Sequence, residues 1–586
     1  MKRTKIVCTI GPASDSEEVL DQLMNEGMDV CRLNFSHGSH EEHGKRIETI
    51  RQLRKKRGLP VALALDTKGP EIRLKTFQND QAVELKQGDA FTLTTRDIVG
   101  DSGIVAVSYE GLPQDVKPGS RILIDDGLVE LQVQSIEDGT EIHCVALNYG
   151  TISNRKGVNV PGTDIKLPAI TEGDRSDILF GIEQGIDFIF ASFIRTAQDI
   201  LEIRKILEEN GGSGIHIYAK IESEQGVRNI DEILDAGDGI MVARGDLGVE
   251  IPTQEVPIVQ KQIIRKANLA GKPVITATQM LDSMIRNPRP TRAEVNDVAN
   301  AILDGSDAIM LSGETAAGKY PVEAVRQMKM IAEVTEASSD FKRSIKNRKN
   351  WLENTTSSAI AQSTCLIAEQ IQAAAIVPTT ASGFTCRQIS KFRPSCPIVA
   401  TTMDERVFHQ LNLVWGAHPV LSQDSEHTDE LIERSIYAAL HSGFVQEGDQ
   451  IVLTAGIPVG KGTSTNLIKV QTIGDILVSG QGVGRGSVTG KAVLGSTAGE
   501  LADKMEEGDI LVAKFTGADL IPYIEKAGGV VVEEGGLTSH AAIVALHYGK
   551  PTVIGAMNAS KLIGEGETIT LDATTGIVYA GEAQVL

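Results

Sequence analysis

The sequence predicts an α/β protein built around a (β/α)₈ (TIM) barrel. Three observations indicate this fold. Short apolar runs recur eight times between residues 4 and 315, helix-like stretches such as 200–210 and 255–271 lie between most of them, and each run ends in polar or glycine residues. Eight strands that alternate with helices are typical of this barrel, whose catalytic groups lie at the carboxyl ends of the strands.

The predicted strands share a short apolar body and a polar or glycine-containing end. In chain order they are TKIVCTIGP (4–12), MDVCRLNFSHG (28–38), PVALALDTKGP (60–70), IDFIFASF (186–193), IHIYAKIES (215–223), GIMVARGDLG (239–248), KPVITATQM (272–280) and DAIMLSGET (307–315).

Residues 70–166 interrupt this alternation between the third and fourth strands. They are strand-like and rich in turns, as in GDAFTLTT and GSRILIDDGLVELQVQSIEDG. We therefore predict that residues 1–69 and 167–340 form the barrel. An all-β lid domain is inserted on a loop at its catalytic end.

Two further domains are predicted beyond residue 340. The charged stretch DFKRSIKNRKNW marks a boundary, and residues 341–473 again alternate helix and strand, which indicates a second, smaller α/β domain. A last domain occupies residues 474–586. The glycine-rich stretch SGQGVGRGSVTGK (479–491) has the composition of a linker leading into it.

The composition limits the classes of function. Of the 586 residues, 41% are hydrophobic and 23% are charged, which is ordinary for a globular protein. The formal net charge of −21 argues against nucleic acid or an anionic membrane as the main partner. The six scattered cysteines indicate a reducing, cytoplasmic environment. We expect no signal peptide and no membrane span, which needs about 20 apolar residues.

Charged and hydroxyl side chains gather at the predicted strand ends. In the second strand, Arg32, Asn34 and Ser36 alternate and therefore share one face. A solvated face is the plain alternative, but the inward face of a barrel strand is normally buried, and a buried arginine needs a partner. The third strand ends in Asp66 and Thr67.

The fifth and sixth strands end in groups that suit a divalent cation. Lys220 and Glu222 share a face, and Asp246 follows the sixth strand. Carboxylates at neighbouring strand ends suit Mg²⁺ or Mn²⁺, which is held by one or two carboxylates together with substrate phosphate and water. Gly245 lies in a turn whose backbone N–H groups could bind a carboxylate. A purely structural Lys–Glu pair is the alternative interpretation.

Two more strand ends complete this set. Arg73 could reach a phosphate from the start of the lid, and Thr278 adds a hydroxyl after the seventh strand. The strand ends thus offer cations for a phosphate, carboxylates for a metal and oxygens for a further cation. Phosphoryl transfer depends mostly on positioning and electrostatic stabilisation, which such a set can supply.

The same segments resemble the pyruvate kinase family. The matching segments are CRLNFSHG, LDTKGPEIR, AKIESEQG, MVARGDLGVE, TATQML, RPTRAEVNDVANAI and MLSGETAAGKYP. The resemblance covers residues 1–473. It implies a glycolytic enzyme that transfers a phosphoryl group from phosphoenolpyruvate to ADP, giving ATP, and then protonates the enolate to pyruvate.

The resemblance also implies catalytic roles. Arg32, Arg73 and Lys220 would surround the phosphoryl group, and Lys220 would neutralise charge in the transition state rather than form a Schiff base. Glu222 and Asp246 would hold Mg²⁺ or Mn²⁺.

The substrate carboxylate would lie elsewhere in the same site. Gly245, Asp246 and Thr278 would bind it, and Thr278 would also lie near the path of the proton, whose donor the resemblance leaves open.

Further residues match the family's potassium and nucleotide sites. Asn34, Ser36, Asp66 and Thr67 would bind K⁺, and Glu71 is the residue type that accompanies potassium dependence in the family.

The resemblance further implies that nucleotide would bind at Asn34, His37, Arg73 and Lys156.

The domain at 341–473 resembles the family's regulatory domain, which implies allosteric control and a homotetramer. Its segment TTASGFT (379–385) offers hydroxyl and backbone N–H groups ahead of a helix, and GKGTSTN (460–466) would face it. The predicted phosphate-binding residues are Thr379, Thr380, Ser382, Gly383 and Thr385. The implied effector is AMP or a sugar monophosphate rather than a sugar bisphosphate, and a plain turn with a helix cap is the alternative.

The last domain resembles the swivelling phosphohistidine domain of phosphoenolpyruvate synthase and pyruvate phosphate dikinase through GGLTSHAAIVA. In those enzymes the histidine matching His540 carries a phosphoryl group. Here Leu546 replaces the arginine that normally follows the pattern, and no ATP-loading domain is recognisable. A structural or regulatory module is therefore favoured.

Three hypotheses from different classes remain open. The first is a metal-dependent kinase that uses the barrel. The second is a dikinase-like phosphotransferase with His540 as carrier, and the third is an inactive, effector-binding regulator.

Overall fold

The computed structural model describes residues 1–346, 354–424, 427–457, 465–474 and 476–583. These residues divide by packing into two compact units. The first unit comprises Met1–Trp351, Ser390–Arg393 and Asp404–Pro419, and the second comprises Leu352–Ile389, Pro394–Met403 and Val420–Leu586.

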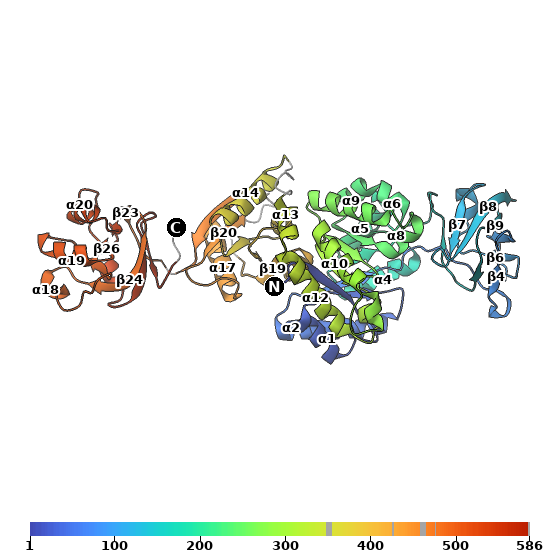
Figure 1. Cartoon of the computed structure of the whole chain (residues 1–586), viewed down its shortest axis with the longest axis horizontal. Helices are drawn as coiled ribbons and strands as arrows, with labels where there is room; N and C mark the ends of the chain where they lie inside the picture. Colours follow the sequence, from blue (N-terminus) through green and yellow to red (C-terminus); the bar gives the residue numbers. More distant parts are fainter. Residues whose placement is uncertain (347–353, 425–426, 458–464, 475, 584–586) are drawn as a thin grey trace. The chain divides into compact units, whose positions relative to one another are not determined.

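A closed barrel of eight parallel strands forms the centre of the first unit and confirms the predicted fold class (Figure 1). The strands around the barrel are β1 (Lys5–Thr9), β16 (Ala308–Leu311), β15 (Val274–Ala277), β14 (Gly239–Ala243), β13 (His216–Ile221), β12 (Phe188–Ala191), β3 (Ala62–Asp66) and β2 (Val30–Asn34).

Alternation along the strands separates two apolar layers. Side chains such as Val7, Phe190 and Met241 fill the barrel interior. Their neighbours pack outward against the helices in a larger core. Both faces of these strands are therefore apolar, as expected for a parallel sheet that is covered on both sides.

The helices around the barrel begin and end at residues suited to those positions. The main ones are α1 (Glu17–Glu26), α2 (His40–Arg57), α4 (Glu172–Glu183), α5 (Ala197–Glu209), α7 (Ile230–Ala236), α9 (Val256–Leu269), α10 (Arg292–Asp304) and α12 (Pro321–Ala337). Ser39, Thr171 and Thr291 close capping boxes at the starts of α2, α4 and α10.

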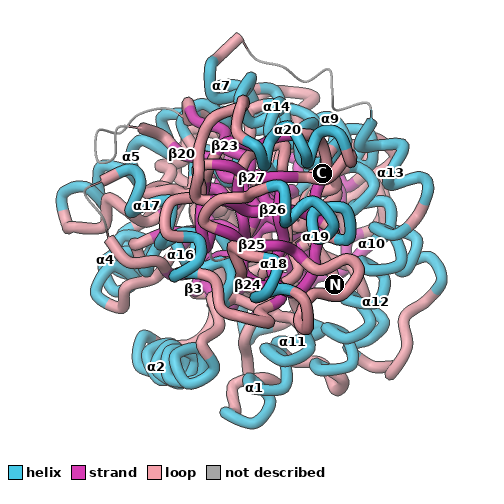
Figure 2. The backbone as a smooth tube through the Cα atoms, turned by 90° about the vertical axis from the view of Figure 1, so that its left-hand side faces the viewer, coloured by secondary structure: helices cyan, strands magenta, loops and turns pink. Residues whose placement is uncertain are grey.

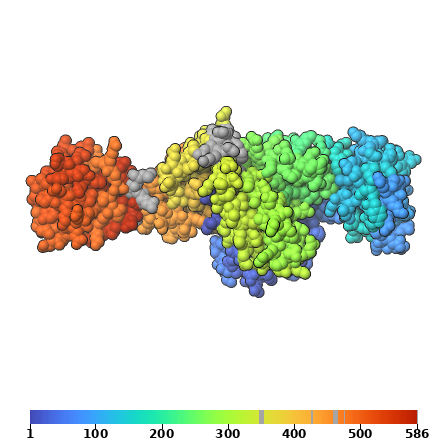
Figure 3. Space-filling view, viewed as in Figure 1, coloured from blue at the N-terminus to red at the C-terminus, as the bar shows by residue number. Residues whose placement is uncertain are grey.

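The lid has its own apolar core. Its surface is coloured in blue shades in the space-filling view (Figure 3). It contains a six-stranded and a two-stranded sheet, together with one short helix, α3 (Leu112–Asp115). Its strands are β4 (Val83–Leu85), β5 (Ala90–Thr94), β6 (Ile104–Ala106), β7 (Arg121–Ile124), β8 (Val129–Glu137), β9 (Glu141–Ala146), β10 (Gly150–Ile152) and β11 (Val158–Asn159).

Two segments from beyond residue 340 pack with the barrel, at the amino ends of its strands. Arg393 Nη1 donates to Asp307 Oδ1 at 2.9 Å, and Gln410 Nε2 donates to the carbonyl oxygen of Gly214 at 2.8 Å. Lys5 Nζ donates to the carbonyl oxygen of Ala417 at 2.6 Å. The catalytic ends of the strands lie opposite to these contacts.

The second α/β domain has a five-stranded sheet in the order β19-β18-β17-β20-β21. The strands are β17 (Ala375–Pro378), β18 (Ile398–Thr402), β19 (Ala417–Leu421), β20 (Gln450–Ala455) and β21 (Leu467–Thr472), and the helices are α14 (Thr356–Gln370), α15 (Phe384–Ser390), α16 (Glu405–Gln410) and α17 (Thr428–His441).

The last domain has an eight-stranded sheet with the helices α18 (Ala498–Leu501), α19 (Ile521–Lys526) and α20 (His540–His547) beside its strands (Figure 2). The strands are β22 (Ile476–Ser479), β23 (Gln481–Val483), β24 (Ser487–Leu494), β25 (Ile510–Ala513), β26 (Gly529–Val532), β27 (Thr552–Ile554), β28 (Thr568–Asp572) and β29 (Ile577–Ala580).

The predicted linker at 479–491 is wrong, because most of this stretch forms β23 and the start of β24 inside the sheet. Its glycines permit close backbone packing rather than flexibility. A Cβ atom on Gly482 would lie 1.9 Å from the carbonyl oxygen of Ala573. Among the described residues, no helix combines the length and apolar character that a membrane crossing requires.

Candidate active site

The register of the barrel brings the predicted strand-end groups together. Asn34 on β2 pairs with Asp66 on β3, and Asp66 pairs with Phe190 on β12. Lys220 lies two strands further round, on β13. Side chains far apart in the sequence therefore converge at one end of the barrel.

A buried cluster of charges occupies this end. Arg32 Nε donates to Asp66 Oδ2 at 2.5 Å, and Arg32 Nη1 donates to Thr9 Oγ1 at 2.9 Å. Lys220 Nζ lies 3.1 Å from both Asp66 Oδ1 and Glu222 Oε1. The exposed fraction of these four charged side chains is 11% or less. The predicted sharing of one face by Lys220 and Glu222 is thus observed.

The cluster keeps Lys220 and Asp66 charged. Burial by itself lowers the pKa of Lys220, but Asp66 and Glu222 outweigh it and the net shift is upward. Burial likewise raises the pKa of Asp66, but Arg32 and Lys220 outweigh it and the net shift is downward. Each charge is therefore balanced by a partner, as buried charges require.

Glu222 and Asp246 are two carboxyl groups whose pKa values are both raised. Burial raises the pKa of Glu222 to about 7; Lys220 opposes this rise and Asp246 adds to it. Burial also raises the pKa of Asp246. A divalent cation between them would stabilise both ionised carboxylates, and substrate and water would complete its coordination shell. No cluster of three or more His, Cys, Asp or Glu side chains suited to a metal occurs within the described ranges.

Thr278 and Gly245 meet at the next strand ends. The backbone N–H of Gly245 donates to Thr278 Oγ1 at 2.9 Å. Thr278 has φ = +69°, an uncommon conformation for a β-branched residue. Arg244, to which the sequence assigned no role, donates from Nη2 to the carbonyl oxygen of Thr278 at 2.7 Å and from Nη1 to Asp297 Oδ1 at 2.7 Å. Arg244 therefore links the segment that follows β14 to the segment that follows β15.

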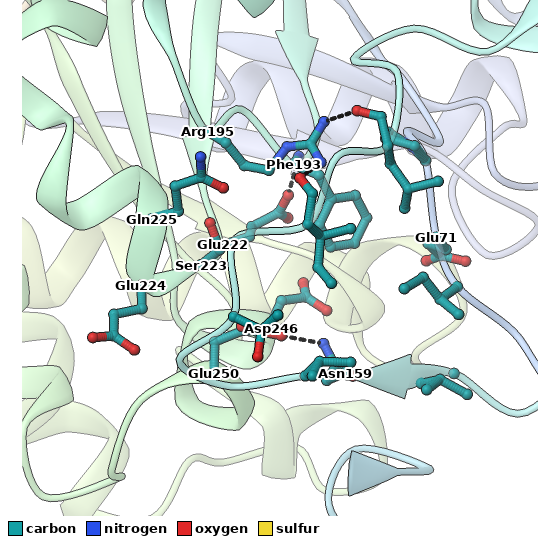
Figure 4. Close-up of a pocket in the computed structure, with 18 of the residues that line it drawn as sticks. Glu71, Asn159, Phe193, Arg195, Glu222, Ser223, Glu224, Gln225, Asp246 and Glu250 are labelled. Atoms are coloured by element: carbon teal, nitrogen blue, oxygen red, sulfur yellow. Dashed lines mark hydrogen bonds between the residues drawn. The ribbon is translucent and has the colours of Figure 1, made fainter. Parts of the chain in front are cut away.

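A pocket of about 330 Å³ lies between the base of the lid and the ends of β13 and β14 (Figure 4). Glu222 and Asp246 line it together with Arg73 and Lys156. Arg73 Nε donates to Glu71 Oε2 at 2.6 Å. The other predicted barrel residues are not among the lining residues of this pocket.

Lys156 is paired within the lid, where Nζ lies 2.8 Å from Asp125 Oδ2. The lid and the barrel thus each contribute charged groups to the same cavity.

The predicted potassium ligands lie around the ends of β2 and β3. Asn34 Oδ1 accepts from the backbone N–H of Ser36 at 3.1 Å. Both carboxylate oxygens of Asp66 accept hydrogen bonds from the charge cluster. Thr67 Oγ1 accepts from the backbone N–H of Ser192 at 3.0 Å. Four neighbouring oxygen-bearing residues are of the kind that K⁺ could use.

The predicted nucleotide residue His37 lies on the loop that follows β2. Its carbonyl oxygen lies 2.8 Å from His43 Nε2. This contact connects the loop to the first turn of α2.

The predicted effector loop follows β17 in the second unit. Thr379, Thr380 and Thr385 are buried, Ser382 is exposed, and Gly383 has φ = +76°. Residues 460–464 of the facing segment lie outside the described residues.

Hydroxyl groups at this loop bond to one another. Thr385 Oγ1 lies 2.7 Å from Thr465 Oγ1, and Thr379 Oγ1 lies 2.9 Å from Ser435 Oγ.

His540 begins helix α20 and is half-buried. Its Nδ1 lies 3.0 Å from Thr516 Oγ1, and Ser539 caps the helix by accepting from the N–H of Ala542. Leu546 is 54% exposed. The ring of His540 is therefore held through Nδ1 by the hydroxyl of Thr516, at the start of the helix.

Comparisons with known proteins identify relatives for every domain. Residues 1–325 match the barrel domain of pyruvate kinase, residues 358–471 match its alpha/beta domain, and residues 505–576 match the mobile domain of PEP-utilising enzymes.

Similar proteins match over the full length of the chain. It is 54% identical over 586 residues to a pyruvate kinase of Geobacillus stearothermophilus and 52% identical over 587 residues to one of Bacillus licheniformis; both matches cover 100% of each chain. The solved structure of a pyruvate kinase from Cryptosporidium parvum is 41% identical, with a TM-score of 0.76, and the match covers 80% of this chain and 96% of that one.

The matched relatives are phosphotransferases, so this chain, whose barrel carries a buried charge cluster at the carboxyl ends of its strands, is a phosphotransferase. More specifically, the chain belongs to the pyruvate kinase family. The family and the phosphotransferase activity predicted from the motifs are thus confirmed, as is the resemblance of the last domain to PEP-utilising enzymes.

Proposed function

We propose that the barrel site transfers the phosphoryl group of phosphoenolpyruvate to ADP, giving ATP and the enolate of pyruvate, which is then protonated. The buried cluster of Arg32, Asp66, Lys220 and Glu222 carries this proposal. Two fixed cations beside a carboxylate pair offer charge stabilisation that costs no reorganisation during the reaction.

The chain's own residues take distinct parts in this transfer. Arg32 and Lys220 bind and orient the phosphoryl group, and Lys220 stabilises the charge that develops on it. Gly245, Asp246 and Thr278 hold the substrate carboxylate. The hydrogen bond between Gly245 and Thr278 supports this proposal because it holds the two residues side by side, within reach of one carboxylate.

Nucleotide binding is proposed at the face shared by the lid and the barrel. Arg73 and Lys156 line the pocket, Asn34 is the last residue of β2, and His37 lies on the loop that follows this strand. Arg73 pairs with Glu71 and Lys156 with Asp125, all within the lid, and both cations would exchange these carboxylates for phosphate oxygens when nucleotide binds.

Two kinds of cation fit the oxygen donors. Glu222 and Asp246 would hold Mg²⁺ or Mn²⁺, which would neutralise charge on the transferring group. Asn34, Ser36, Asp66 and Thr67 would hold K⁺.

Potassium dependence leads to a first prediction. At saturating Mg²⁺, replacing K⁺ by tetramethylammonium should lower the turnover rate by about tenfold or more, because a fixed positive charge is lost beside the reacting phosphoryl group. A coupled assay with phosphoenolpyruvate and ADP measures this. Glu71→Lys, which supplies a charge from the protein, should reduce the dependence. Equal rates with and without K⁺ would rule out the site.

Regulation is proposed at the loop 379–385. The chain passes from β17 to β18 and β19 on one side of the sheet and later to β20 on the other, so the strand order reverses between β17 and β20. Ligands of α/β sheets bind outside the carboxyl ends of the strands at such a point. The buried hydroxyl groups there suit the phosphate of AMP or of a sugar phosphate.

A homotetramer and a cytoplasmic location complete the proposal, and both rest on the family resemblance alone. The same coupled assay, repeated with AMP and with sugar phosphates, tests the regulatory part.

The alternative role of His540 as a phosphocarrier leads to a second prediction. His540→Ala should leave turnover and both Michaelis constants within about twofold of the wild type, because the barrel cluster is complete without it. The assay should be paired with thermal unfolding to show that the variant is folded. Loss of pyruvate formation by a folded variant would favour the carrier hypothesis instead.

A further inference from the structure

The turn that follows β12 touches both Lys220 and Glu222. It consists of Ser192 and Phe193, to which neither the sequence patterns nor the proposed mechanism assigns a part. Ser192 is 3% exposed, so its contacts are made away from solvent.

The hydroxyl of Ser192 joins the amine of Lys220 to the end of β3. Lys220 Nζ donates to Ser192 Oγ at 2.7 Å, which is shorter than its 3.1 Å contacts with the two carboxylates. Ser192 Oγ in turn donates to the carbonyl oxygen of Thr67 at 2.6 Å. A hydroxyl has one hydrogen to donate, so this second bond directs a lone pair of Ser192 at Lys220.

Phe193 holds the neighbouring carboxylate. Its backbone N–H donates to Glu222 Oε2 at 2.6 Å (Figure 4). Phe193 has φ = +54°, an uncommon and costly conformation for a bulky side chain. The surrounding contacts must therefore maintain this turn.

Gly69 permits the close approach that maintains the turn. A Cβ atom on Gly69 would lie 2.8 Å from Ser192 Cβ and 2.9 Å from Phe193 Cδ2. Gly69 itself has φ = +73°. The segment that leads from β3 to the lid thus packs directly against the turn.

We propose that Ser192 is a positioning residue of the phosphotransfer site, whose hydroxyl sets the direction in which Lys220 presents its amine. The backbone of Phe193 fixes Glu222 in the same turn, so one strained segment orients both the cation and the metal-binding carboxylate. The inference rests on the proposed role of Lys220.

Ser192→Ala tests the inference. We expect kcat to fall by about 10- to 100-fold, because an approximately 1 Å displacement of a catalytic group has an effect of this order. The KM for phosphoenolpyruvate should change by less than about threefold, since the substrate carboxylate is held elsewhere. Should the Ala variant not fold, Ser192→Cys fills the same space with a weak acceptor and gives the same test.

Ser306→Ala is the matched control. Ser306 is 1% exposed, and its hydroxyl also makes two hydrogen bonds, to Thr276 Oγ1 at 2.7 Å and to the carbonyl oxygen of Ala301 at 2.8 Å. It precedes β16 and so lies at the amino end of the barrel. We expect this variant to lose thermal stability and keep its kcat.

A Lys220→Met variant distinguishes failure of the positioning role of Ser192 from failure of the proposed role of Lys220. There, adding Ser192→Ala should change the residual kcat by less than about twofold, because coupled residues are not additive. A wild-type kcat for Ser192→Ala beside an inactive Lys220→Met would overturn the positioning role alone. Full activity of Lys220→Met would overturn the role of Lys220 and the inference with it.

Discussion

Lys220→Met should lower kcat by about 10³-fold or more, because a single well-placed cation is worth this much in phosphoryl transfer. Burial and two carboxylate partners hold the amine in place, and the net upward shift of its pKa keeps it charged through the neutral range. The coupled assay measures kcat, and the KM for phosphoenolpyruvate should change far less.

Lys5→Met provides the control for this substitution. Lys5 is also buried and bonds to the carbonyl oxygen of Ala417, but at the amino end of the same barrel. It should therefore lose stability without a matching loss of kcat. If both variants lost activity equally, the effect of Lys220→Met would reflect the fold rather than the chemistry.

Glu222→Gln should raise the Mg²⁺ concentration for half-maximal activity by about 10- to 100-fold or more, the range seen even for groups that only support a metal ligand. In the wild type this concentration should also depend on pH. Because the metal-free pKa of Glu222 is about 7, protons compete with the metal below that pH. The half-maximal Mg²⁺ concentration should rise by about tenfold per pH unit below 7, and the Gln variant should show a weaker dependence.

The same pKa sets the pH dependence of stability. The pKa of Glu222 is about 7 in the folded, metal-free protein, whereas the ordinary value of 4.5 applies in the unfolded chain. Its contribution to stability is therefore fully present below pH 4.5 and is lost as the pH rises through 7. Mg²⁺ offsets this loss, so its addition should raise the unfolding temperature more at pH 8 than at pH 6.

Glu250→Gln is the control for the metal site. Glu250 lines the same pocket, and burial raises its pKa too, but it pairs with Asn159 of the lid. Its replacement should leave the Mg²⁺ requirement unchanged. A shift equal to that of Glu222→Gln would show that the requirement reports only the total charge of the pocket.

Much of the barrel follows from local patterns. Apolar runs of strand length that alternate with helical stretches predict the eight strands, and two-residue spacing predicts that Lys220 and Glu222 share a face. Composition was a poorer guide. The glycines of 479–491 resemble those of a linker, yet Gly482 permits the close backbone contact of β23 inside a sheet.

By itself, the sequence determined the eight strands, the charged residues at their ends and the family to which the chain belongs, because all three depend on short spacings along the chain. Only the tertiary structure placed Ser192 against Lys220, bound both oxygens of Asp66 to cations, and packed 390–393 and 404–419 with the barrel. The reason is physical: these contacts join residues tens to hundreds of positions apart. Closure of the barrel decides them, and no local spacing encodes them.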